Sequence, residues 1–185
     1  MKKLTIASLL IISAVLMTGC ASPARVNEMT TSASAAQRIA NTPMRNNVAV
    51  REVTGGKDTN PMWMSNIGGS EFEQALESSL RDAGLLSSGK QAGKYTLTVH
   101  MEKVEQPMFG ASMTVTATVN YSLVERASGK EVFNRTIALP FTAAWNSSFI
   151  GTERLRLANE GAIRVNIGKI IDELFAVRVD AVALN

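Results

Sequence analysis

Histidine and cysteine, two residue types that often carry catalysis or bind metals, occur once each in this 185-residue chain. His100 lies in a run in which apolar and polar residues alternate, so we expect it on the polar face of a strand beside Thr98 and Glu102. A metal site needs several ligands, and a nucleophilic pair needs a serine or cysteine next to the base. The sequence nominates no such partners, so we expect neither a catalytic residue nor a metal ligand at His100.

Residues 84–90, GLLSSGK, are similar to the start of a phosphate-binding loop, and SSGK also fits the S-x-x-K pattern of penicillin-interacting enzymes. A phosphate-binding loop follows a strand and opens a helix, whereas this segment follows a predicted helix and precedes a predicted strand. Gln91 also occupies the position of the Ser or Thr that would bind Mg²⁺. We therefore expect a loop here and a protein that is not an enzyme, with a hydrolase or transferase as the least favoured alternative.

The chemistry that the sequence supports best is acylation of the Cys20 thiol. Lys2 and Lys3 are followed by an apolar-rich run over residues 4–16. At about 1.5 Å per residue, roughly 13 residues are too few for a ~30 Å hydrocarbon core and are typical of a secretory signal peptide. The run ends in Met17, Thr18, Gly19 and Cys20. These four residues resemble the bacterial lipobox, in which a signal peptidase cuts just before the cysteine.

The lipobox resemblance implies a diacylglycerol and an N-acyl chain on Cys20 and no other cofactor. Two or more acyl chains hold a protein durably on a membrane, whereas one chain holds it only marginally. Acylation would also protect a lone thiol that would otherwise be reactive in an oxidising compartment. Ala21 follows the cysteine, whereas an Asp there retains lipoproteins in the inner membrane of Gram-negative bacteria. In such a host the resemblance implies the periplasmic face of the outer membrane.

Composition divides the chain into three parts. Residues 1–19 are the expected signal peptide, residues 20–46 a lipidated N-terminus with a flexible tether, and residues 47–185 a single α/β periplasmic domain. The tether is expected because residues 21–46 are rich in Ala, Ser, Thr and Asn and offer little apolar surface to bury. The net charge of +3 includes Lys2 and Lys3, so the mature chain is nearly neutral, which argues against nucleic acid and anionic headgroups as partners.

Hydrophobic periodicity predicts an α+β fold. We expect a strand near residues 48–53, a helix over 70–83, and three antiparallel strands over 95–102, 113–123 and 133–139, the last ending at Pro140. A second helix covers residues 152–174, and residues 177–184 are a possible fifth, C-terminal edge strand. This order predicts a two-layer sandwich: a mainly antiparallel four-stranded sheet with both helices on one face and a threonine-rich opposite face.

This topology brings three loops with large apolar residues to one end of the sheet, if the first helix connects parallel strands. The eight residues are Met62, Trp63, Met64, Met108, Phe109, Phe141, Trp145 and Phe149. They either fold inward and close the end of the core or form a docking surface for a partner. We expect the tether to enter the first strand from the opposite end, which would point this tip away from the membrane.

As a whole, the chain resembles small bacterial outer-membrane lipoproteins of an uncharacterised family. The Asn60-Pro61-Met62-Trp63 segment before the first helix carries this resemblance, and the order of elements is similar to that of the lipopolysaccharide-assembly accessory lipoprotein. The resemblance implies an accessory module that binds an envelope protein through its tip or its polar sheet face. The alternative is a carrier for a lipid-like or cell-wall ligand held between the helices and the sheet.

Overall fold

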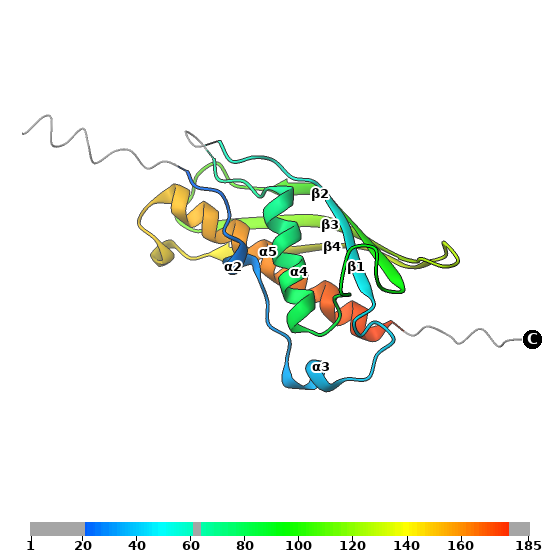
Figure 1. Cartoon of the computed structure of the whole chain (residues 1–185). Coiled ribbons are helices and arrows are strands. Elements are labelled where there is room, and N and C mark those ends of the chain that lie inside the picture. The colour runs from blue at the N-terminus through cyan, green and yellow to red at the C-terminus, as the bar shows by residue number, and fades with distance from the viewer. Residues whose placement is uncertain (1–20, 61–63, 178–185) are drawn as a thin grey trace, which may run out of the picture.

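The computed structural model describes residues 21–60 and 64–177 and confirms the predicted α+β fold. A four-stranded sheet forms one layer, and helices α4 and α5 form the other (Figure 1). The elements are α2 (Val26–Met29), α3 (Ala35–Ile39), β1 (Val48–Gly55), α4 (Gly69–Asp82), β2 (Tyr95–Glu105), β3 (Met113–Glu125), β4 (Glu131–Ala143), the 3₁₀ helix η1 (Trp145–Ser147) and α5 (Gly151–Ala176).

The strands follow one another across the sheet in chain order, β1-β2-β3-β4. β1 pairs parallel with β2, and the other two pairs are antiparallel. The ends of β1, β2 and β4 therefore lie together with the start of β3 at one end of the sheet, which we call the apolar end. The β3–β4 hairpin lies at the other end, which we call the hairpin end. The predicted helix between two parallel strands is confirmed.

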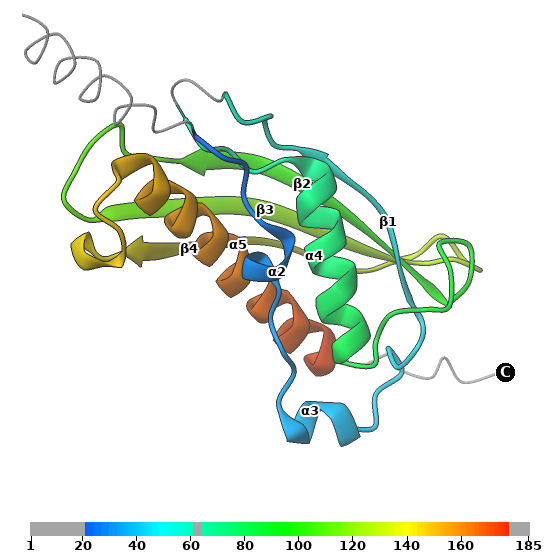
Figure 2. The ribbon, with the colours of Figure 1, turned by 60° about the vertical axis from the view of Figure 1, so that its left-hand side comes forward.

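The alternation of apolar and polar residues along β2 and β3 sets which face is buried. On β3, Val115, Val119 and Leu123 are fully buried, while Thr114 and its neighbours of opposite parity are more exposed. The buried face packs against α4 and α5, whose fully buried residues include Leu76 and Ile163. The threonine-rich face has no helix of the described segments over it (Figure 2).

Residues 21–46 form a strap that is packed onto the helical layer, so the prediction of a flexible tether is wrong for these residues. The strap starts at the apolar end, passes between α4 and α5 at α2, and reaches β1 at the hairpin end (Figures 1 and 2). Met29 and Met44 are fully buried in the core. Polar contacts hold the rest: Thr31 N donates to Ser79 Oγ at 3.0 Å and Ala33 N to Asp82 Oδ2 at 2.8 Å.

Two further predictions concern the ends of elements. β4 does not stop at Pro140 but continues to Ala143, because it is an edge strand of the described sheet and an edge strand tolerates a missing N–H donor. This extension places Phe141 within the strand and not in the following loop. The possible C-terminal edge strand over residues 177–184 lies almost entirely outside the described residues, and Val177 is the C-cap of α5.

Candidate functional site

Two loops at the apolar end carry large apolar side chains that are exposed. Residues 106–112 join β2 to β3, and residues 144–150 join β4 to α5 and include η1 (Figure 2). We call them the apolar loops. Their exposed large residues are Met108 (84% exposed), Phe109 (86%), Trp145 (62%), Phe149 (93%) and Ile150 (57%). Exposed apolar residues that are grouped in neighbouring loops mark a contact with another molecule more often than single, scattered ones do.

Arg154, in the first turn of α5, joins the two apolar loops. Its guanidinium donates to Ser148 O at 2.6 Å and to Gly110 O at 3.2 Å, so one side chain binds a backbone carbonyl of each loop. At the base of the loops, the Thr114 and Thr142 hydroxyls lie 2.9 Å apart on paired strands. The two loops are therefore held as neighbours by hydrogen bonds.

The apolar loops carry no charged residue. No Asp, Glu, Lys, Arg or His occurs in residues 106–112 or 144–152. The β3–β4 connection at the hairpin end is different, because Glu125, Arg126, Lys130 and Glu131 lie within seven residues. The two sets of connections therefore differ in polarity, and the uncharged loop segments cost less to remove from water than the charged hairpin.

Some residues of the predicted tip fold inward. Phe141 is half-buried, and its ring packs on α5 at Gly161, where an added Cβ would lie 2.1 Å from Phe141 Cδ1. The Arg164 guanidinium lies 5.5 Å from the centre of the same ring. Met64 also packs partly against the core. The predicted tip is thus divided: Phe141 and Met64 help to close the core, whereas Met108, Phe109, Trp145 and Phe149 are exposed.

Met62 and Trp63 of the predicted tip lie outside the described residues.

The first residues of the strap lie beside the apolar loops. Ser65 Oγ donates to Ser22 O at 2.7 Å, and Ser65 O accepts from Gln106 Nε2 at 3.1 Å. Gln106 Nε2 also donates to Asn159 Oδ1 at 2.6 Å, and Asn159 Nδ2 donates to Ser65 O at 2.8 Å. These bonds connect Ser22 to the first residue of an apolar loop. The chain enters β1 from the hairpin end, as expected, but the strap carries its first residues back, so that Ala21 lies at the apolar end.

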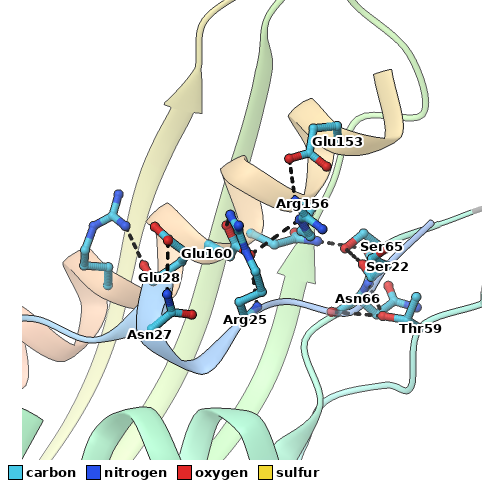
Figure 3. A network of polar contacts seen from close by, with 12 residues as sticks. Ser22, Arg25, Asn27, Glu28, Thr59, Ser65, Asn66, Glu153, Arg156 and Glu160 are labelled. Atoms are coloured by element: carbon cyan, nitrogen blue, oxygen red, sulfur yellow. Dashed lines mark hydrogen bonds and ion pairs between the residues drawn. The ribbon is translucent and has the colours of Figure 1, made fainter. Parts of the chain in front are cut away.

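An ion pair fixes the next part of the strap to α5 (Figure 3). Arg25 Nε lies 2.9 Å from Glu160 Oε1 and Arg25 Nη2 lies 3.1 Å from Oε2, while the Arg25 backbone N–H donates to Oε1 at 3.0 Å. The Glu160 side chain is 1% exposed and also faces Arg156 Nε at 3.6 Å. The hydrogen bond with Glu160 raises the pKa of Arg25. Arg164 extends the attachment by donating to Glu28 O.

This attachment was not predicted from the sequence, although one signal was present. Glu160 lies on the apolar stripe of α5 between Ala158 and Ala162, and a carboxylate at such a position needs a cationic partner. Arg156 is that partner at spacing i, i+4, but Arg25 lies 135 residues away in sequence. Arg154 and Ile150 were missed for a similar reason, because their roles depend on how the loops pack.

The sites considered from sequence stay apart in the structure. His100 is exposed on β2, and its Nδ1 lies 2.9 Å from Thr54 Oγ1 of β1. Residues 84–90 follow α4, and part of this segment lines a shallow cavity of about 220 Å³ with Glu77 and Arg81. Within residues 21–60 and 64–177, no group of three His, Cys, Asp or Glu residues could hold a metal ion. In the same segments, no helix has both the length and the apolarity of a membrane span.

The interior between the sheet and the helices is filled by side chains. Leu76 of α4, Val119 of β3 and Ile163 of α5 are among the residues with no exposed surface there. Asn166 of α5 is also buried, donating to Ala117 O at 3.1 Å and to Ile137 O at 3.0 Å and accepting from Tyr121 Oη at 2.7 Å. Burial raises the pKa of the Tyr121 hydroxyl well above its ordinary value. The alternative function, a carrier for a lipid-like or cell-wall ligand, would place the ligand in this space, which these side chains occupy.

Comparisons with known proteins relate the chain to others by fold alone. No family model matches the sequence, and no curated protein matches it significantly. A protein from Xanthomonas campestris, described as a DUF330 family member, superposes with a TM-score of 0.56 at 14% identity, over 71% of this chain and 84% of that one. A candidate lipoprotein from Caulobacter crescentus superposes with a TM-score of 0.51 at 14% identity, over 72% and 90%. At this identity the likeness concerns the fold only.

Proposed function

We propose that this chain is a lipid-anchored protein of the bacterial envelope that is held by acyl chains on Cys20, binds a partner protein and performs no catalysis. The observation that carries the proposal is the combination of a signal-like run ending in Met17-Thr18-Gly19-Cys20 with a strap that is packed on the domain from its first described residues onward. Durable attachment by diacylglycerol and an N-acyl chain agrees with this sequence. Because Ala21 is not Asp, we place the anchor in the periplasmic face of an outer membrane.

The partner-binding part of the proposal rests on the uncovered face of the sheet. Thr116 pairs with Pro140, Thr118 with Ala138 and Asn120 with Thr136 across β3 and β4, which leaves a face of short, mostly uncharged side chains. Such a face is suited to a protein surface that offers hydrogen-bond groups to threonine and asparagine side chains.

The anchor is tested by growing the host with a labelled fatty acid and comparing the wild type with Cys20→Ala. We expect label on the wild-type protein and recovery of that protein with the outer membrane, and we expect neither for C20A. Wild-type protein without label, or label that survives the C20A change, would refute the anchor.

The partner face is tested by site-specific photocrosslinking in the envelope. A crosslinking residue at Thr118 lies on the uncovered sheet face, whereas the matched position Arg81 is exposed on α4 on the opposite layer. We expect one discrete adduct from position 118 and none of the same mass from position 81. Equal adducts from both positions, or none from position 118, would contradict partner binding through the sheet.

A further inference from the structure

We propose that the apolar loops insert into the surface of the lipid bilayer that holds the acyl chains of Cys20. The domain then rests on its membrane through two contacts, the covalent lipid and the side chains of Met108, Phe109, Trp145, Phe149 and Ile150. This inference rests on the proposed acylation of Cys20, and it reverses the orientation expected from the sequence.

The position of the first described residues carries the argument. Cys20 is joined to Ala21, so its Cα lies within ~3.8 Å of that of Ala21. Ser22 is hydrogen-bonded to Ser65, which is bonded in turn to Gln106 at the start of an apolar loop. The start of the strap and the apolar loops lie at the same end of the domain (Figure 1), so acyl chains on Cys20 would leave the protein at that end.

The strap prevents the domain from turning away from its anchor. A flexible tether of 26 residues would span an average of about 28 Å and leave every face of the domain free. Here Arg25 is bound to the buried Glu160 carboxylate, only five residues after Cys20. Met29 is buried four residues further on. The anchor thus keeps the apolar end close to the membrane surface.

The composition of the apolar loops fits a lipid surface. Tryptophan and phenylalanine favour the boundary between headgroups and acyl chains, and charged residues resist it. The loops offer Trp145, Phe109 and Phe149, and they carry no charge over residues 106–112 and 144–152. The hairpin end lies at the opposite end of β3 and β4 and is charged, as expected for an end that faces water.

The test uses the full-length lipidated protein in phosphatidylcholine vesicles that contain brominated acyl chains, which quench nearby tryptophan. Trp63→Phe leaves Trp145 as the only tryptophan. The matched control, W63F/W145F/A127W, places the only tryptophan in the exposed β3–β4 hairpin. Thermal unfolding by circular dichroism verifies that each variant is folded.

We expect shallow bromines to quench Trp145 about twofold, because an interfacial side chain reaches ~5–10 Å into the boundary region, and to leave the tryptophan of A127W unaffected. Acylated protein in which Trp145 is not quenched, or in which both tryptophans are quenched alike, would overturn the inference and leave the anchor intact. Trp145 shielded from aqueous iodide but not quenched by bromine would show that a protein covers the loops instead, which also overturns it. Failure of the anchor itself is seen separately, as protein that carries no acyl mass.

Discussion

Arg25→Ala should release the strap from α5 and lower the stability of the domain. The substitution removes both hydrogen bonds from the guanidinium to Glu160, at 2.9 and 3.1 Å, from a carboxylate that is 1% exposed. Breaking a buried ion pair by removing one partner costs about 3–5 kcal/mol. Glu160 keeps the Arg25 backbone N–H at 3.0 Å and Arg156 at 3.6 Å, and the Arg25 side chain is 43% exposed. We therefore expect a loss of about 2 kcal/mol, below the range for a fully buried pair.

Thermal unfolding by circular dichroism should report this loss as a fall in Tm of about 4–8 °C for a domain of this size. Limited trypsin digestion should show the local effect, because a released strap exposes the bonds after Arg38 and Arg45 at temperatures where the domain stays folded. Arg51→Ala, at an exposed position of β1, is the matched control and should change neither readout. A Tm within about 1 °C of the wild type, with unchanged cleavage in the strap, would refute the view that Arg25 fixes the strap.

Three other predictions concern the helical layer. Gly161→Ala should destabilise the domain by about 1–2 kcal/mol in urea unfolding, because the added Cβ would lie 2.1 Å from Phe141 Cδ1. Gly168→Ala should stabilise it by about 0.5–1 kcal/mol, because the nearest atom to its added Cβ is 3.9 Å away. Shifts of the same sign for the two variants would contradict this. Asn166→Ala should cost about 3 kcal/mol in the same assay because three buried hydrogen bonds are lost, and a cost below about 1 kcal/mol would contradict it. Hydrogen bonds from the Ala33 amide and then from Arg38 lower the pKa of Asp82, so Asp82 stabilises the fold above its ordinary pKa and this contribution is lost as the pH falls through the lowered value. Asp82→Asn should therefore lose less stability than the wild type between about pH 5 and pH 3, and parallel pH profiles would count against this role.

The sheet could be predicted from sequence because its signals are local. Apolar and polar residues alternate along residues 113–123, and this local pattern predicts the buried face of β3 without reference to the strands that pair with it. The extension of β4 past Pro140 was missed because it depends on β4 being an edge strand, which is a property of the whole sheet.

The strap could not be predicted because its contacts are distant in sequence. The composition of residues 21–46 indicates too little apolar surface for packing. Met29 and Met44 are nevertheless buried in the core that residues of α4, α5 and β1 form. The polar contacts of the strap reach residues up to 136 positions away in sequence. The path of the strap along the domain, which brings Ser22 back beside the apolar loops, could not be predicted for the same reason.

The candidate site was half predictable for the same reason. Strand order alone brought the loops of Met108 and Trp145 to one end, because antiparallel neighbours must turn at fixed ends of a sheet. Which side chains stay exposed there depended on packing: Phe141 finds a surface to pack on only because Gly161 has no side chain.

Mass spectrometry of the N-terminal peptide, from protein extracted from the host membrane, tests the acylation of Cys20 directly. We expect a peptide that begins at Cys20 and carries the mass of a diacylglycerol and an N-linked acyl chain. A peptide that begins at Met1, or one that begins at or after Cys20 without acyl mass, would contradict the anchor and with it the orientation of the apolar loops toward the membrane.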